Sequence, residues 1–148
     1  MLAALAVRPL FQESEDWSTF ISLLLLAGLP LPESGEPARF YAVEDEVGLV
    51  GFGGLEGSGC DQLLRSLVTV PGLRRRGLGP LLANRLIEQA KRDGAKRLWL
   101  LTSEAAEFFA ELGWVPVERD SAPETVRQSR LFRELCPATA VLMSRSLG

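Results

Sequence analysis

The stretch from residue 66 to 91, SLVTVPGLRRRGLGPLLANRLIEQAK, constrains this chain more than any other. An apolar, β-branched run that ends at Pro71 predicts a strand, and apolar residues at helical spacing from Leu78 to Ala90 predict a helix. The turn between them is rich in glycine and arginine. Because the first N–H groups of a helix have no partner inside it and the helix dipole adds positive charge there, this order of elements predicts a phosphate-binding turn.

The spacing within the turn narrows the choice of ligand. The pattern Arg74-x-x-Gly77-x-Gly79 lacks the third glycine of the dinucleotide fingerprint, and no Gly-Lys-Ser/Thr follows as in a Walker loop. Gly77 and Gly79 allow a ligand to approach the backbone, and Arg74, Arg75 and Arg76 add positive charge. The pattern resembles the acetyl-CoA pyrophosphate loop of the GNAT N-acetyltransferase superfamily, Arg/Gln-x-x-Gly-x-Gly/Ala.

The resemblance extends to both sides of the loop. The strand before it, Leu67-x-Thr69-x-Pro71, is similar to the family's Leu-x-Val-x-Pro, and residues 105–114 (AAEFFAELGW) resemble its second helix and closing Gly-aromatic step. The resemblance implies the acyl-CoA N-acyltransferase fold. This is an α/β (α+β) fold with a mixed, mostly antiparallel sheet of about six to seven strands, helices on both faces, and splayed fourth and fifth strands.

The rest of the chain agrees with one domain over residues 1–148, since this length can bury a sizeable core. Hydrophobic periodicity and turn residues predict the order of elements. Strands are expected at 5–8, 40–44, 48–55, 60–70, 97–102, 114–118 and 140–144, and helices at 17–27, from 78 to the stop at 93–94, at 104–112 and at 122–135.

Composition removes several classes of function. The net charge of −3 does not favour nucleic acid as a partner. No segment reaches transmembrane length, and the opening residues lack the pattern of a signal peptide, so no membrane is expected. The chain has no histidine, and its two cysteines have no metal-type spacing, so no metal is expected and a reduced, cytoplasmic setting is the default.

Three segments narrow the resemblance further. GLEGSGCDQLLRSL, LLTSEAAEFFAELGW and APETVRQSRLFRELCPATAVLM resemble the arsenic-resistance branch of the superfamily, which acetylates small amino acids such as arsinothricin, a relative of phosphinothricin. The implied function is transfer of the acetyl group of acetyl-CoA to the primary amine of such an amino acid. An acetyltransferase of protein or peptide amines and a non-catalytic acyl-CoA-binding module remain alternatives. The oligomeric state is open, although family members are often homodimers.

The resemblance also assigns residues to the cosubstrate. Backbone groups of Leu67, Val68 and Thr69 would bind the pantetheine arm, with the Leu67 N–H donating to the oxyanion. Thr102 stands where relatives often carry an asparagine that contacts CoA. Pro80 departs from the family, because it lacks an N–H that many relatives use, and arginine charge would compensate. The pyrophosphate would lie against residues of the loop, namely Arg74, Arg75, Arg76, Gly77, Leu78 and Gly79.

The catalytic base is expected to be a carboxylate that acts through water. Glu56 is the first candidate because it ends the strand beside the fourth strand, and a solvated turn acid is the alternative reading. Glu104 is the second candidate, although a first-turn acid favoured by the helix dipole is preferred there. Phe109 takes the place of a tyrosine that protonates the leaving thiolate in many relatives, so the thiolate is expected to leave unaided.

An acidic acceptor would need an arginine in its binding site. Arg65 is the first candidate because a charged residue in so apolar a strand needs a reason, and the alternative is a rim residue that faces solvent. Arg39 and Arg119 are further candidates. Cys136 is interpreted as a buried structural cysteine, since one cysteine does not make an arsenite site.

Overall fold

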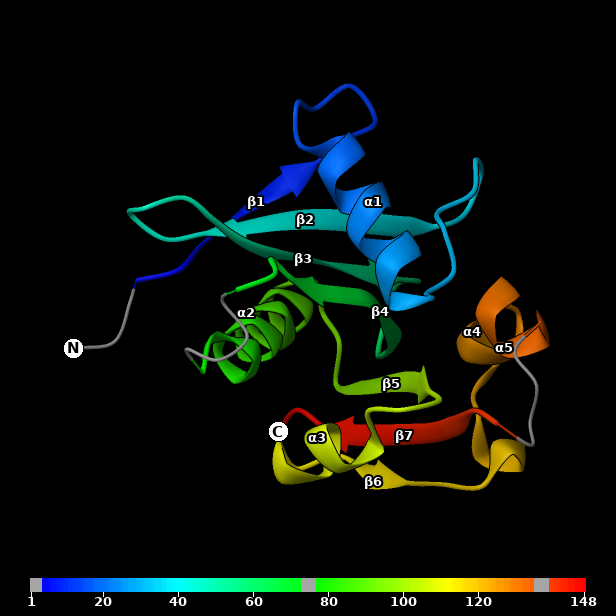
Figure 1. Cartoon of the computed structure of the whole chain (residues 1–148). Helices are drawn as coiled ribbons and strands as arrows, with labels where there is room; N and C mark the ends of the chain where they lie inside the picture. Colours follow the sequence, from blue (N-terminus) through cyan, green and yellow to red (C-terminus); the bar gives the residue numbers. More distant parts are fainter. Residues whose placement is uncertain (1–3, 73–76, 135–138) are drawn as a thin grey trace.

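The structure is a computed structural model that describes residues 4–72, 77–134 and 139–148. Within them the chain forms a seven-stranded sheet of order β1-β2-β3-β4-β5-β7-β6 (Figure 1), antiparallel between all neighbours except β4 and β5. The strands are β1 Ala6–Leu10, β2 Ala38–Glu44, β3 Leu49–Glu56, β4 Asp61–Thr69, β5 Arg97–Thr102, β6 Val115–Pro116 and β7 Val141–Ser146. The helices are α1 Trp17–Ala27, α2 Leu78–Arg92, α3 Ala106–Glu111, the 3₁₀ helix η2 Arg119–Ser121, α4 Glu124–Arg127 and α5 Arg130–Glu134.

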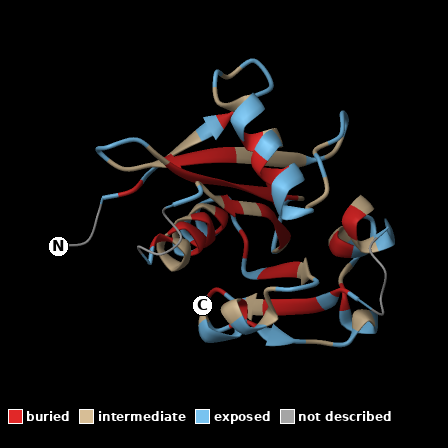
Figure 2. Ribbon diagram, in the orientation of Figure 1, coloured by how far each residue is buried: buried red, intermediate tan, exposed pale blue. Residues whose placement is uncertain are grey.

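Helices cover both faces of the sheet, and buried residues line the central strands (Figure 2). Because successive strand residues point to opposite faces, Leu63 and Leu64 of β4 belong to different cores. Leu64 packs with α2 and α3 residues such as Leu82 and Phe109, whereas Leu63 packs with α4 and α5 residues such as Val126 and Leu131. Helix α1 packs on β1 to β4 through a third cluster, formed by Leu10, Phe20, Leu23, Leu24, Ala42, Phe52 and Val68.

Strands β4 and β5 diverge, as the resemblance implied. They pair in parallel only where Asp61–Leu63 face Arg97–Trp99, and residues 64–69 of the described chain have no partner in β5. On the other side of β4 the register with β3 shifts between Phe52 and Gly54. Ser66 lies at this bulge with a positive φ of 59°. A bulge bends the strand locally, so β4 diverges from β5 next to a bulge in its pairing with β3.

Helix α1 has the predicted bounds, and its leucines are buried to different degrees. Leu23 is buried, whereas Leu25 is 62 % exposed. The helix ends at Gly28, whose φ of 69° suits glycine. Asp16 precedes the helix without a side-chain capping bond and forms an ion pair with Arg8 instead.

The segment expected as one helix over 122–135 is broken, and that prediction is wrong. It contains α4 and α5, which Ser129 separates because its hydroxyl bonds locally to the backbone. Ser129 Oγ donates to the Val126 carbonyl at 2.7 Å and accepts the Phe132 N–H at 3.2 Å, which favours the start of a new helix. Strand β6 is also shorter than the expected 114–118, because η2 turns the chain soon after Pro116, which has no N–H for a ladder.

Candidate functional site

The N-terminus of α2 presents the backbone that the phosphate loop requires. Gly77 occupies the capping position with a φ of 72°, and a Cβ added there would meet no described atom within 4 Å. Leu78 and Gly79 form the first turn of this 15-residue helix. The first N–H groups of an α-helix have no partner inside the helix, and such groups can bind an anion. Pro80 lies in the same turn and supplies no N–H, and Arg74, Arg75 and Arg76 lie outside the described residues.

The diverging part of β4 leads directly into this helix terminus. Leu67 packs toward the α2 core and Val68 is buried in the α1 core, so their side chains anchor the strand between two cores. The backbone of Leu67, Val68 and Thr69 lies along the edge that β5 leaves unpaired. An extended ligand can bind such an edge as an added strand, which is the arrangement predicted for the pantetheine arm.

Arg65 is buried beside the same edge with a carboxylate on either side. Its side chain has no exposed surface, and Nη1 lies 2.8 Å from Glu36 Oε2 and 2.8 Å from Glu56 Oε1. Nε donates to Ser66 Oγ at 3.2 Å, and the guanidinium carbon lies 5.5 Å from the centre of the Phe40 ring. Nη2 is buried without a hydrogen-bond partner in the described part of the chain. The alternative readings of Arg65 as a rim residue and Glu56 as a solvated turn acid are therefore wrong.

A cavity of about 530 Å³ adjoins this cluster. Arg130 of α5 reaches it across the molecule: Nη2 donates to the Leu31 carbonyl at 2.6 Å, and Nε lies 3.4 Å from both Glu33 Oε1 and Glu36 Oε2. No sequence pattern indicated this arginine, because 94 residues separate it from Glu36. The cavity lining consists of Glu33, Ser34, Gly35, Glu36, Pro37, Glu56, Gly57, Ser58, Thr125, Gln128, Ser129, Arg130 and Arg133.

The charges of this cluster stabilise one another. Burial raises the pKa of Glu36, but the Glu33 N–H, Arg65 and Arg130 together outweigh burial and hold it below its usual value of 4.5. Burial lowers the pKa of Arg130, and the surrounding carboxylates, Glu36 first among them, raise it overall. The cluster therefore keeps both signs of charge close together at the wall of one cavity.

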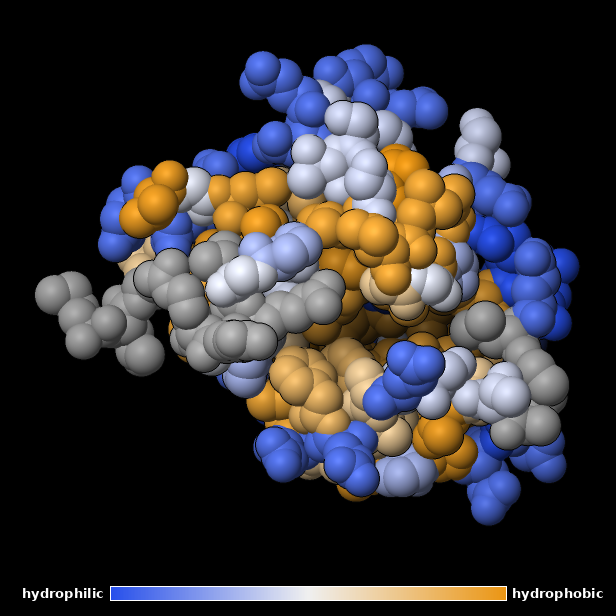
Figure 3. Space-filling model, viewed as in Figure 1, coloured by the Kyte–Doolittle hydropathy of each residue, from blue (hydrophilic) through white to orange (hydrophobic). Residues whose placement is uncertain are grey.

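The cluster lies where the sheet opens. Glu56 pairs with Leu63, the last β4 residue that also pairs with β5. Figure 3 shows the surface hollowed between the half of the molecule that carries α1 and the half that carries β5 to β7, with apolar surface along the upper rim. Leu25 and Leu26 of α1 supply exposed apolar surface, being 62 % and 80 % exposed.

Other predicted residues lie outside this cavity. Thr102 Oγ1 accepts the Ala105 N–H at 2.9 Å, which fixes the turn before α3, and Glu104 is exposed in that turn. Phe109 is buried against Trp114, with ring centres 5.7 Å apart.

The two further arginine candidates make contacts elsewhere. Arg39 bonds to Gln62 at 2.8 Å and pairs with Asp93 at 3.1 Å. Arg119 donates to the Phe132 carbonyl at 2.8 Å. Cys136 lies outside the described residues.

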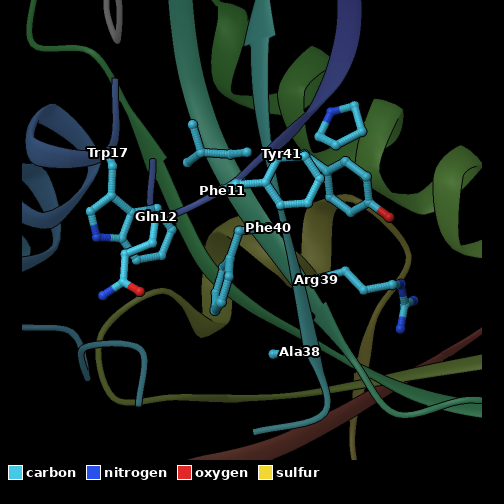
Figure 4. A pocket seen from close by; sticks show the side chains of 9 residues that line it. Phe11, Gln12, Trp17, Ala38, Arg39, Phe40 and Tyr41 are labelled. Carbon is cyan, nitrogen blue, oxygen red and sulfur yellow. The ribbon is translucent and has the colours of Figure 1, made fainter. Parts of the chain in front are cut away.

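A second cavity of about 420 Å³ lies at the end of β1, where β2 loses its neighbour. Figure 4 shows Phe40 on the side of Trp17, and Arg39 and Tyr41 on the opposite side of β2. The Tyr41 hydroxyl lies 3.4 Å from Asp93 Oδ2. Phe40 also contacts Arg65, but none of the residues that line this cavity lines the cavity beside Glu36 and Glu56.

The described residues lack two further features. None of their helices is both long and apolar enough to cross a membrane. They contain no group of three or more aspartate, glutamate, cysteine or histidine side chains that could hold a metal ion.

Comparison with protein families matches residues 36–116, more than half of the chain, to the family described as acetyltransferase (GNAT) domain. Among curated proteins, the amino-acid acetyltransferase of Escherichia coli (strain K12) is 36 % identical over 58 residues, which are 39 % of this chain and 13 % of that protein. That of Yersinia pseudotuberculosis serotype O:1b (strain IP 31758) is 38 % identical over 53 residues, 36 % of this chain and 12 % of that protein. The matches thus span about an eighth of the length of these curated relatives.

Solved structures share the fold over nearly the whole chain. N-acetylglutamate synthase from Neisseria gonorrhoeae, complexed with coenzyme A and N-acetyl-glutamate, superposes with a TM-score of 0.78 at 24 % identity, over 100 % of this chain and 36 % of that one. A GNAT-family acetyltransferase from Staphylococcus aureus Mu50 superposes with a TM-score of 0.72 at 15 % identity, over 98 % of this chain and 100 % of that one.

Proposed function

The chain belongs to the GNAT acetyltransferase domain family. We propose that it is an acetyl-CoA-dependent N-acetyltransferase and that its acceptor is a small amino acid with an acidic group, of the arsinothricin or phosphinothricin type. We further propose that this reaction takes place in the cytoplasm. The observation that carries the proposal is the cavity beside β4, whose wall combines Glu33, Glu36 and Glu56 with Arg130 and Arg133. A small zwitterion with a further acidic group needs both signs of charge within a few ångströms, because its ammonium and its acid must each be paired when water is excluded.

Two further findings support an amino acid as acceptor. The curated relatives that match part of the chain are named amino-acid acetyltransferases. The cavity adjoins Glu56, at the point where β4 loses its β5 neighbour, so an amine held there would be near the strand edge proposed for the thioester. A volume of about 530 Å³ suits a small molecule rather than a folded partner.

The proposed reaction uses few protein groups. Glu56 takes a proton from the acceptor ammonium through a water molecule, and the neutral amine attacks the thioester carbonyl carbon. A C–N bond forms, and the Leu67 N–H stabilises the negative charge on the carbonyl oxygen. The C–S bond then breaks, CoA leaves as the thiolate, and the nitrogen of the new amide loses its second proton to water. The α2 N-terminus at Gly77, Leu78 and Gly79 would hold the pyrophosphate, with Thr102 and the arginines of the loop as further proposed contacts.

The buried position of Phe109 agrees with departure of the thiolate without a protein acid. Its ring packs against Trp114 and Phe108 and carries no proton to donate. A thiolate is a stable leaving group at neutral pH compared with an alkoxide, so water can protonate it after the C–S bond breaks.

The test is release of CoA thiol from acetyl-CoA with a panel of amines. The panel contains arsinothricin, phosphinothricin, glutamate, polyamines and N-terminal peptides. We expect release with the acidic amino acids, and arsinothricin or phosphinothricin as the best acceptors would support the arsenic-resistance branch. Release with peptides alone would refute the proposal in favour of peptide acetylation, and CoA binding without release from any amine would favour a non-catalytic module.

A further inference from the structure

Glu36 occupies a position where two arginines from distant parts of the chain converge. Arg65 Nη1 lies 2.8 Å from Glu36 Oε2, and Arg130 Nε lies 3.4 Å from the same oxygen. Arg130 Nη2 lies 3.5 Å from the other oxygen, Oε1. Two guanidinium groups around one carboxylate form the kind of site that binds carboxylates, phosphinates and phosphonates, because each guanidinium offers several N–H donors in one plane.

The arginines retain donors that Glu36 does not satisfy. Arg65 Nη2 and Arg130 Nε are both buried without a hydrogen-bond partner within the described chain. Arg65 itself has no exposed side-chain surface, and among the described residues Glu36, Glu56 and Ser66 contact its polar atoms at bonding distance. A ligand with more acceptor oxygens than one carboxylate could therefore satisfy more of these donors than Glu36 does.

The two carboxylates that pair with Arg65 differ in how the chain holds them. Glu56 is the last residue of β3 and pairs with Leu63 in the ladder. Glu36 belongs to the irregular segment between α1 and β2, next to Gly35, whose φ is 87°. Glu36 lies in the wall of the 530 Å³ cavity, with Arg65 behind it and absent from the lining. Displacement of Glu36 would open Arg65 to the cavity without breaking a strand pair.

We propose that Glu36 is an internal ligand of the Arg65–Arg130 pair and sets the acceptor specificity, because the acidic group of the acceptor must take the place of its carboxylate. This inference rests on the proposed function. An acidic acceptor replaces one negative charge with another, so neither guanidinium is left buried without a partner. A neutral acceptor of the same shape cannot make this replacement, and the arginine pair therefore rejects it.

The experiment measures binding by isothermal titration calorimetry to the full chain, with L-glutamate and phosphinothricin as acidic probes and L-glutamine as the neutral probe. Glu36→Gln removes the competing charge. We expect it to bind the acidic probes about tenfold more tightly than the wild type and to leave L-glutamine binding unchanged, since tenfold corresponds to roughly one charge-assisted hydrogen bond. Equal or weaker binding of the acidic probes by this variant would overturn the inference.

Matched variants separate competition from a general effect of charge. Glu88→Gln also removes a carboxylate that pairs with an arginine, Arg85 at 3.1 Å, but on the surface of α2, and it should leave all three affinities unchanged. Arg130→Gln should weaken binding of both acidic probes and reduce the gain produced by Glu36→Gln, because the two residues share one site. Full additivity of the two substitutions would count against the inference.

A second substitution keeps the test open if Glu36→Gln does not fold. Glu36→Asp retains the charge but shortens the side chain by one methylene, so its contact with Arg65 should lengthen. We expect about threefold tighter binding of the acidic probes than in the wild type. Wild-type affinity in this variant would contradict the internal-ligand role.

Thiol release from acetyl-CoA, measured in parallel, distinguishes this inference from the proposed function. Tighter acid binding by Glu36→Gln, with no acetyl transfer to any acidic amino acid, would refute the proposed function and leave the internal ligand supported. Acetyl transfer to phosphinothricin or glutamate, with no change of affinity in Glu36→Gln, would refute only the inference.

Discussion

At the residue scale, the Glu56 carboxylate has a structural role in an ion pair and a proposed role as the catalytic base. Its carboxylate lies 2.8 Å from the Arg65 guanidinium and also borders the cavity. Glu56→Gln is expected to lower kcat for an acidic amino acid by about a hundredfold or more, because an amide cannot accept the proton, while the KM for acetyl-CoA stays unchanged. Steady-state thiol release measures both constants. Turnover equal to that of the wild type would remove Glu56 as the base.

A stability control accompanies that substitution, since it also alters a buried ion pair. The free energy of unfolding of Glu56→Gln and of the wild type should be compared by urea denaturation at the assay temperature. If the variant remains fully folded and still binds CoA, a lower kcat reflects a slower chemical step and not a loss of folded protein.

Arg65 contributes to the fold through the same contacts. Arg65→Met leaves Glu36 and Glu56 next to each other without the guanidinium between them, and Glu56 is only 3 % exposed. We expect the free energy of unfolding to fall by about 3 kcal/mol, the usual cost of removing one member of a buried charged cluster. Arg8→Met is the matched control: Arg8 also pairs with two acids, Asp16 and Glu44, but it is 38 % exposed, so about 1 kcal/mol or less is expected. Equal losses in the two variants would contradict the role of burial.

At the scale of elements, helix α2 offers a direct test of the phosphate loop. Gly77→Glu places a carboxylate at the helix N-terminus, where it should repel the pyrophosphate and reduce CoA affinity at least about tenfold. Gly94→Glu is its control at the other end of the helix, because Gly77 and Gly94 have positive φ values of 72° and 94° and no described atom within 4 Å of an added Cβ. Both variants should lose stability through the positive φ, Gly94→Glu somewhat more because the helix dipole disfavours an acid at the C-terminus, and only Gly77→Glu should lose CoA binding by calorimetry. Normal CoA binding by Gly77→Glu would show that the phosphate site lies elsewhere.

The elements that the sequence predicted well are those with a continuous local pattern. The β4–turn–α2 order follows from β-branched residues, glycines and a helical apolar period that all lie within 30 residues of one another. The break between α4 and α5 was not predictable in this way, because Ser129 is compatible with a helix interior as well as with a local backbone bond. The exposure of Leu25 likewise depends on which elements pack around α1, and the spacing of apolar residues within the helix does not reveal those elements.

The candidate site was predictable only in part for a related reason. Glu56 and Arg65 stood out because charged residues adjoin apolar strands, and the structure brings them to 2.8 Å. Glu36 and Arg130 gave no such signal, since each lies in a polar segment typical of a solvated surface. Their contact depends on the tertiary fold, which brings the segment before β2 against α5.

At the scale of the whole molecule, polar contacts join two halves that the sheet connects weakly. The β4–β5 ladder contains only the pairs of Asp61–Leu63 with Arg97–Trp99. Arg130 adds a link between the half that carries α5 and the segment after α1, through Leu31, Glu33 and Glu36. The ionisation of Glu36 should therefore affect the stability of the entire fold rather than of one loop.

The sign of this effect follows from the lowered pKa of Glu36. Burial alone would raise that pKa, but the Glu33 N–H and the two arginines hold it below 4.5 in the folded chain. The folded state therefore binds the proton more weakly than the unfolded state does. The contribution of Glu36 to stability is fully present above its unfolded pKa and is lost as the pH falls through the folded pKa.

Glu36→Gln tests this linkage, because glutamine resembles the protonated glutamate. At about pH 7 the variant should be less stable than the wild type, and the difference should shrink as the pH falls below the unfolded pKa and through the lowered folded pKa, because the wild-type carboxyl then becomes protonated as well. Urea denaturation of both proteins across this range measures the two free energies. A difference that stays constant down to about pH 3 would mean that the Arg65–Arg130 pair does not favour the charged form of Glu36.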